Sequence, residues 1–231
     1  MAAIARASRI RNPVLFICDI QEIFRSHVYG FDKVVSTTQK LLRAAQPLSI
    51  PAYITTQNRA RLGNTVSEIT SLLARNGNGG DAGAGNGNVN VRLDVDKTMF
   101  SMMTDEVRAD LEKLKGTSIG SGGGSTGSAA PDVIIVGLET HICVTQTTLD
   151  LLESGYRVYV IADGVSSVNP EESKVALARL RDAGAIVTTS EGVIFEILRD
   201  AKNSGFKAIN ALVKDSKNDT KAALETLAKA V

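Results

Sequence analysis

Three residues of this chain, Cys143, Asp19 and Lys97, are of types that act together in nucleophilic catalysis. Cys143 lies in the stretch PDVIIVGLETHICVTQTTLDLLESG, which runs from an apolar strand through a Gly-Leu-Glu-Thr turn into a helix. A thiol in the first helical turn lies near unpaired N–H groups and the positive end of the helix dipole, and both favour the thiolate. A thiolate there is a nucleophile for a carbonyl carbon. A cysteine can equally be a small buried core residue, and its position alone leaves both interpretations open.

Asp19 and Lys97 supply the acid/base group and the cation that such a thiol needs. Asp19 directly follows the apolar run VLFIC, where a carboxylate is costly unless it is paired or functional. As a base it would take the thiol proton and return it to a leaving group; the alternative is a cap on the next turn. Lys97, in RLDVDKTMFSMM, would stabilise both anions. Its alternative is a surface lysine paired with the neighbouring acids.

Further residues around the candidate nucleophile can be assigned from spacing. Thr140 lies three residues before Cys143, the spacing of an N-cap and the third helical position, so the Cys143 N–H would point at a bound oxygen. Cys18, inside a strand-like run, is expected to be a buried core residue. His141 is too close to Cys143 on the turn to serve as its base, although it could line the pocket. With two histidines and no CxxC motif, no metal or other cofactor is expected.

The elements that must position these residues alternate between strand and helix. Five near-continuous apolar runs predict strands buried on both faces, at 14–18, 52–56, 132–136, 157–162 and 185–189. Helical periodicity lies between them, at 32–46, 143–153 and 171–183. This alternation predicts an α/β fold with a parallel sheet covered on both faces.

Function in such sheets gathers beyond the carboxyl ends of the strands, where Asp19 and Cys143 both fall. Asp163 also follows a predicted strand, but Asp-Gly there favours an ordinary turn. The strand order cannot be read from the pattern.

The chain is expected to form a single domain over 1–231. Segments 76–90 and 116–130 hold twelve of the twenty glycines, and we expect flexible insertions there, because they cannot bury enough apolar surface to offset their ordering entropy. Neither matches a phosphate-binding loop. The tail 215–231 has the stripe of a C-terminal helix that docks or contacts another subunit.

Composition excludes several classes of partner. Twenty-six basic and 25 acidic residues give a formal charge of +1 with no sustained basic run, so nucleic acid is not an expected partner. No apolar stretch reaches the ~18 residues of a membrane span. Two cysteines and no secretory signal favour a cytoplasmic protein. Three arginines in the first eleven residues give a faint mitochondrial alternative.

The motifs together resemble the isochorismatase-like cysteine hydrolase family over nearly the whole chain outside the two insertions. The resemblance rests on four segments in the family's order: FICDIQEIF, DKTMFS, GLETHICV and ADGVSS. Within the family, LETHICVTQTTLDLL and ALARLRDAGAIVTTSEGVIFEIL are similar to the eukaryotic branch called isochorismatase domain-containing proteins.

The resemblance implies a three-layer α/β/α sandwich with a six-stranded parallel, Rossmann-like sheet. It also implies a catalytic triad of Asp19, Lys97 and Cys143. A cis peptide at Leu138–Glu139 would turn the Glu139 N–H toward the oxyanion site, beside that of Cys143. Phe24 corresponds to a pocket aromatic of the family.

One departure from the family bears on the substrate. Nicotinamidases of the family carry metal-binding histidines after the second strand, where this chain has Gln57 and Asn58. Metal-dependent nicotinamidase activity is therefore disfavoured. We assign Gln57, Thr140 and Arg59 to the pocket; the alternative for Arg59, favoured for a loop arginine, is a solvated surface residue.

We expect a hydrolase that acts on a small amide, carbamoyl or related substrate, and we expect it to form a homo-oligomer, either a dimer or a tetramer. One alternative is hydrolysis of isochorismate to 2,3-dihydroxybenzoate and pyruvate without covalent catalysis. Another is a non-enzymatic interaction protein that retains the fold.

Overall fold

The computed structural model describes residues 9–73, 89–115 and 130–229. The two segments expected to be flexible insertions, 76–90 and 116–130, lie almost entirely outside these ranges, so that expectation stays a prediction. No helix in the described ranges is long and apolar enough to cross a membrane.

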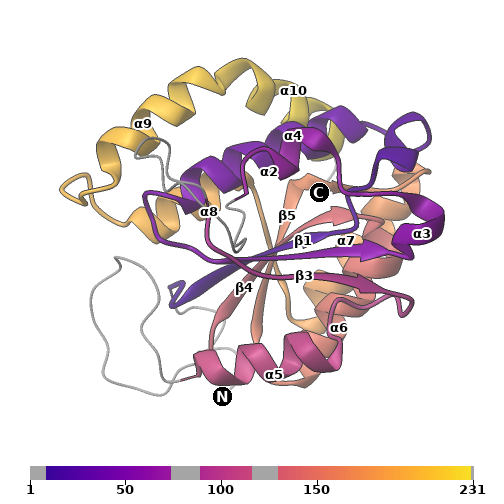
Figure 1. Cartoon of the computed structure of the whole chain (residues 1–231). Coiled ribbons are helices and arrows are strands. Elements are labelled where there is room, and N and C mark those ends of the chain that lie inside the picture. Colours follow the sequence, from indigo (N-terminus) through magenta and orange to yellow (C-terminus); the bar gives the residue numbers. More distant parts are fainter. Residues whose placement is uncertain (1–8, 74–88, 116–129, 230–231) are drawn as a thin grey trace, which may run out of the picture.

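A six-stranded parallel sheet forms the centre of the molecule (Figure 1). Its strands are β1 (Pro13–Cys18), β2 (Ala52–Gln57), β3 (Val91–Lys97), β4 (Asp132–Leu138), β5 (Arg157–Ser166) and β6 (Ile186–Thr188). They lie in the order β3-β2-β1-β4-β5-β6, and each neighbouring pair is parallel. The order changes direction next to β1, so the chain leaves β1 and β4 toward opposite sides. Such a switch point opens a crevice beyond the carboxyl ends of the strands.

Helices cover both faces of the sheet (Figure 1). One face carries α2 (Phe31–Ala45), α4 (Ser67–Thr70), α8 (Ser190–Leu198), α9 (Phe206–Asp215) and α10 (Lys217–Leu227). The other carries α5 (Asp105–Leu114), α6 (Thr145–Glu153) and α7 (Pro170–Ala183). Three short helical segments, η1 (Glu22–Ser26), α3 (Arg59–Leu62) and the π-helical η2 (Thr140–Val144), lie where strands give way to helices. The expected three-layer α/β/α sandwich with six parallel strands is confirmed.

Side chains that alternate along each strand build two apolar cores. Leu15 and Ile17 of β1 face the core under α2, whereas Phe16 and Cys18 face the core under α5, α6 and α7. Because successive strand residues point to opposite faces, a strand buried on both faces must be apolar throughout. This is why the apolar run VLFIC predicts the strand β1.

The structure differs from the predicted elements in three places. β3 was not predicted from its pattern, because VRLDVDK is an edge strand whose residues, apart from the buried Lys97 at its end, are half-buried or exposed. The predicted C-terminal helix is present as α10, which packs on α2 and β5 of its own chain, but it is preceded by a further helix, α9, that was not predicted. Asp163 lies inside β5, not in a turn, and its carboxylate accepts hydrogen bonds from the N–H and hydroxyl of Ser190.

Candidate active site

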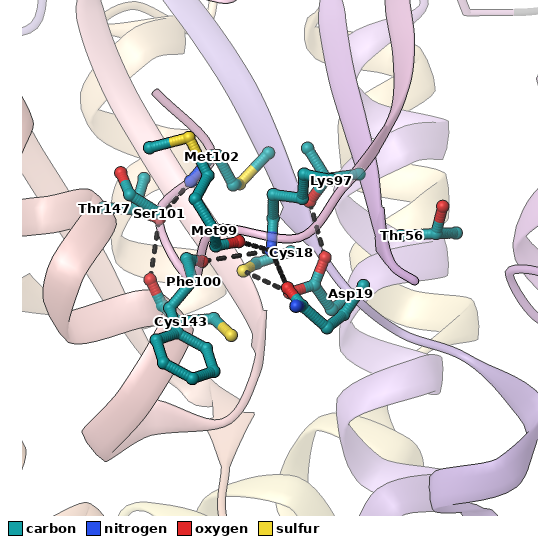
Figure 2. Close-up of polar contacts among 12 residues, drawn as sticks. Cys18, Asp19, Thr56, Lys97, Met99, Phe100, Ser101, Met102, Cys143 and Thr147 are labelled. Atoms are coloured by element: carbon teal, nitrogen blue, oxygen red, sulfur yellow. Dashed lines mark hydrogen bonds and ion pairs between the residues drawn. The ribbon is translucent and has the colours of Figure 1, made fainter. Parts of the chain in front are cut away.

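Asp19 and Lys97 form a buried ion pair at the carboxyl edge of the sheet (Figure 2). Lys97 ends β3 and Asp19 follows β1, and the Lys97 Nζ lies 2.6 Å from the Asp19 Oδ2. Asp19 is 1% exposed and Lys97 is 4% exposed. The surface-lysine alternative for Lys97 is therefore wrong. A buried carboxylate needs a partner of opposite charge, and Lys97 lies at that position.

The backbone at Asp19 aims its carboxylate into the site. Asp19 has a φ of 51°, in the left-handed region, which aspartate tolerates better than most residues. Its N–H donates to the Thr55 carbonyl across the β1–β2 pair, and the Thr55 hydroxyl donates to the Asp19 Oδ1 at 2.7 Å. One carboxylate oxygen is thus held by β2, while the other faces Lys97.

Gln21, two residues after Asp19, fixes the end of β2. Its completely buried side chain donates to the carbonyls of Gln57 and Gly63 and accepts from the Gln57 N–H. This clamp sets the position of Gln57, whose Oε1 accepts a 2.8 Å hydrogen bond from the Lys97 Nζ. Gln57, which we predicted to be a pocket residue, therefore lies at the site and accepts a hydrogen bond from Lys97.

Backbone carbonyls complete the surroundings of the Lys97 ammonium. The carbonyls of Met99 and Phe100, in the loop after β3, accept from the Nζ at 3.2 and 3.0 Å. Burial alone would lower the pKa of Lys97. Coulombic attraction to Cys18, Asp19 and Cys143 outweighs burial, so the pKa of Lys97 is raised. The lysine is therefore a fixed positive charge at neutral pH.

Cys143 lies in η2, immediately before α6, and its side chain reaches the same crevice (Figure 2). It is 7% exposed. The Thr147 hydroxyl donates to the Cys143 carbonyl at 2.6 Å and accepts from the Met102 N–H at 2.8 Å. Through Thr147, the loop after β3 and the turn with the thiol are tied to one another. These hydrogen bonds therefore fix the position of Cys143 relative to the loop that follows Lys97.

The turn before Cys143 differs from the predicted cap. The N-cap position belongs to Glu139, and Thr140 is completely buried, with its hydroxyl accepting a hydrogen bond from Ser173 of α7. The prediction that Thr140 caps the helix is wrong, because the first turn is π-helical and begins at Thr140 itself. The Glu139 carboxylate accepts from the Val168 N–H. The peptide bond Leu138–Glu139 is cis, as expected.

Cys18 belongs to the site as well as to the core. It is completely buried, as expected, and its thiol donates to the Asp19 Oδ2 at 3.7 Å. Its pKa is raised well above the ordinary range by burial, by a hydrogen bond with the Cys143 thiol and by the charge of Asp19. The sequence pattern gave the burial of Cys18 but no signal for this contact, which depends on β1 and β4 being neighbours.

The remaining predicted pocket residues lie in different surroundings. Phe24, in η1, is partly buried against the core under α2. The Arg59 guanidinium pairs with Asp94 at 2.6 Å and donates to the Thr56 hydroxyl, so it is engaged on β3 and not free for a substrate carboxylate. Thr56 points away from the ion pair in Figure 2. His141 is hydrogen-bonded through its Nδ1 to the Ser167 hydroxyl.

The donors present do not form a metal site of the usual kind. In residues 9–73, 89–115 and 130–229, no group of three or more His, Cys, Asp and Glu side chains is placed to hold a metal ion. The charged groups in the crevice are one ammonium and one carboxylate, beside two thiols. Such a set is suited to nucleophilic and acid/base chemistry.

A six-stranded parallel sheet flanked by helices is the architecture of the isochorismatase-like hydrolases. The family model described as the isochorismatase domain matches residues 13–192, and the chain belongs to this family. It is 34% identical over 225 residues to isochorismatase domain-containing protein 2 of Xenopus laevis, covering 95% of this chain and 93% of the relative. The expected resemblance to the eukaryotic branch is confirmed.

Two other similar proteins carry different names. The secreted isochorismatase effector Isc1 of Phytophthora sojae is 37% identical over 221 residues, covering 93% of each chain. A solved structure named MAR1 ribonuclease, from Caenorhabditis elegans, is 34% identical with a TM-score of 0.73, covering 90% of this chain and 93% of that one.

Proposed function

We propose that this protein is a cysteine hydrolase in which Cys143 is the nucleophile, Asp19 the acid/base and Lys97 the fixed cation. The single observation that carries the proposal is the completely enclosed Asp19–Lys97 pair beside a thiol in the first turn of a helix. A buried ion pair is weak evidence for stability, since apolar residues would serve as well. Its placement next to a nucleophile gives it a chemical use.

The proposed reaction has two stages. Asp19 takes the thiol proton, and the Cys143 thiolate attacks the carbonyl carbon of the substrate. The N–H groups of Glu139 and Cys143 stabilise the developing oxyanion. Asp19 returns the proton to the leaving amine, and a thioester on Cys143 remains. Water, deprotonated by Asp19, then hydrolyses the thioester and regenerates the thiol.

Lys97 supplies a fixed positive charge beside Asp19 in both stages. Its raised pKa means that it does not act as an acid at neutral pH, so its contribution is electrostatic. Its contacts with Gln57 Oε1 and with the Met99 and Phe100 carbonyls keep the ammonium in place while Asp19 gains and loses a proton. Gln57 thereby positions Lys97.

A small amide, carbamoyl or related compound is the substrate class that we propose. Such a compound has a carbonyl carbon that Cys143 can attack, an oxygen that the N–H groups can stabilise, and a leaving nitrogen that Asp19 can protonate. The rim beside Lys97 includes Met99 and Phe100, which are 43% and 49% exposed. An apolar substituent on the substrate would contact these side chains.

The test is a panel assay of isochorismate, nicotinamide and small amide and carbamoyl compounds, together with intact-mass analysis. Treatment with a reactive amide or an aldehyde should give one adduct that maps to Cys143 in the wild type and none in Cys143→Ala. An adduct elsewhere, or its persistence in Cys143→Ala, would refute the assignment of the nucleophile.

Isochorismate hydrolysis without covalent catalysis is the alternative that the family name favours. In that case Cys143→Ala would retain substantial turnover of isochorismate, whereas Asp19→Ala would lose it. A ribonuclease activity is the further candidate, because a relative with 34% identity carries that name. Adding an unstructured RNA to the same panel separates ribonuclease activity from isochorismate hydrolysis, since only a ribonuclease would cleave the RNA.

A non-enzymatic interaction protein is the last alternative. It predicts no turnover of any compound in the panel and a partner that binds through the Gly-rich segments. Deleting both segments should leave turnover intact in the enzyme proposals. A homo-oligomeric assembly and a cytoplasmic location also belong to the proposal, and light scattering and cell fractionation test them.

A further inference from the structure

The two cysteines of this chain come together at the carboxyl edge of the sheet. Cys18 ends β1 and pairs in register with Gly137 of β4, and η2, with Cys143, begins three residues after Gly137. Both side chains belong to the same buried cluster under α5, α6 and α7. Figure 2 shows the two sulfur atoms facing the same space beside Asp19, and the Cys18 thiol donates a hydrogen bond to the Asp19 Oδ2 at 3.7 Å.

The two thiols differ in their access to solvent. Cys143 is 7% exposed, whereas Cys18 is completely buried. A small oxidant therefore reaches Cys143 first. Both cysteines are free in the structure. An accessible thiol with a second thiol poised next to it is the arrangement of a redox-sensitive cysteine with its resolving partner.

We propose that Cys18 is a resolving cysteine for Cys143: a peroxide oxidises Cys143 to the sulfenic acid, and Cys18 then closes a reversible disulfide across the site. In the first step, hydrogen peroxide transfers one oxygen to the Cys143 sulfur, which is oxidised, and the peroxide is reduced to water. In the second, the Cys18 sulfur attacks the Cys143 sulfur, the S–O bond breaks, and hydroxide leaves as water.

Asp19 supplies the proton transfer that the second step requires. Cys18 is held as the neutral thiol, and a thiol must lose its proton to attack. Its thiol already donates to the Asp19 Oδ2 at 3.7 Å, so the carboxylate accepts the proton and passes it to the departing hydroxide. Lys97, 2.6 Å from the same oxygen, keeps that carboxylate available as a base.

The disulfide would protect the site while it is inactive. Without a neighbouring thiol, a sulfenic acid reacts with further peroxide to sulfinic and sulfonic acids, which a thiol reductant does not reverse. A thiol in contact has a high effective concentration and competes well with dissolved peroxide. The bond removes the Cys143 thiol from any reaction, and a dithiol restores it.

The test compares the full-length wild type with Cys18→Ser and Cys18→Ala under limiting hydrogen peroxide. Free thiols are blocked with N-ethylmaleimide, and the proteins are analysed by intact mass and by non-reducing peptide mapping. In the wild type we expect a loss of two hydrogen atoms and a cross-linked peptide containing Cys18 and Cys143. In both variants we expect sulfinic or sulfonic acid at Cys143 instead, at least about tenfold more than in the wild type.

Three further observations sharpen the test. The cross-link should form at the same rate at different protein concentrations, as an intramolecular bond does, and dithiothreitol should remove it. In Cys143→Ser, Cys18 should stay reduced at the same peroxide exposure. Equal over-oxidation of Cys143 in the wild type and in both Cys18 variants, with no cross-linked peptide, would overturn the proposal. Circular dichroism shows whether each variant is folded. If one of the two Cys18 variants does not fold, the other still tests the proposal.

These readouts are independent of hydrolysis. If Cys143→Ala retains turnover, the proposed function fails while the disulfide can still form in the wild type. If no disulfide forms, the nucleophilic role of Cys143 is unaffected.

Discussion

Replacing Lys97 by methionine should destabilise the protein far more than removing a comparable surface lysine. The Lys97 Nζ lies 2.6 Å from the Asp19 Oδ2, and both residues are almost completely buried. With an effective dielectric constant of ~20, their attraction is at most roughly 6 kcal/mol. Loss of one partner of a buried pair typically costs about 3–5 kcal/mol, because the other charge is left uncompensated. We expect Lys97→Met to lower the free energy of unfolding by that amount.

A matched control is available on the surface. Lys33 pairs with Asp32 at 2.8 Å, nearly the same distance, but the Asp32 side chain is 70% exposed. Lys33→Met should cost no more than about 1 kcal/mol. The variant Asp19→Asn/Lys97→Met should lose less stability than the sum of the two single variants, because it leaves no buried charge unpaired.

The pH dependence follows from the raised pKa of Lys97. A lysine whose folded pKa lies above its unfolded value stabilises the fold at any pH below the unfolded value, 10.5, and loses that contribution as the pH rises through the folded value. The difference between the wild type and Lys97→Met should therefore be constant from neutral pH upward and should shrink only above 10.5. Guanidinium denaturation at several pH values measures it. A cost below about 1 kcal/mol for Lys97→Met, or strict additivity in the double variant, would refute the reasoning.

Three other predictions concern neighbouring residues. Gly137→Ala should destabilise the fold by more than about 3 kcal/mol in chemical denaturation, because its φ is 121° and a methyl group would lie 2.1 Å from the Cys18 carbonyl oxygen. Gly63→Ala is the control: Gly63 has a φ of 78° but open space around it, so the substitution should cost only about 1 kcal/mol. Thr55→Val should cost about 1.5–3 kcal/mol by the same assay, since it removes the 2.7 Å hydrogen bond to a buried carboxylate; a neutral result would mean that this bond does not hold Asp19. Iodoacetamide at mildly alkaline pH should label Cys143 in the native protein and Cys18 only after unfolding, because burial raises the pKa of Cys18; peptide mapping that finds Cys18 labelled first would contradict this.

Much of the fold was legible because buried parallel strands are apolar along their whole length. β1, β2, β4 and β5 were predicted on that ground. β3 was not predicted, because it lies at the sheet edge and its side chains, apart from that of Lys97, are half-buried or exposed. Its pattern is that of a polar segment, and only its pairing with β2 makes it a strand.

Part of the site could be predicted for a different reason. Asp19 and Cys143 follow strands directly, and parallel strands end at the same edge, so their proximity could be expected. The contacts of Thr55 and Gln21 could not, because both depend on β2 lying beside β1, an order that the sequence pattern does not specify. That Cys18 and Cys143 share one buried cluster depends in the same way on β4 lying on the other side of β1.

Thr140 shows how a local pattern can mislead. Its spacing from Cys143 fits an α-helical N-cap, yet the first turn is π-helical and the cap position moves to Glu139. The Thr140 hydroxyl is then taken up by Ser173 of α7. A wider first turn changes which side chain faces the site, and residue types alone do not report its width.

The central claim, that Cys143 is the nucleophile, is tested most directly by the kcat/KM of Cys143→Ala on the best compound of the panel. We predict a fall of at least about 10³-fold relative to the wild type, with the variant as stable as the wild type to within about 1–2 kcal/mol. A kcat/KM within about tenfold of the wild-type value would contradict the account, because a reaction that proceeds without the thiol does not pass through a thioester.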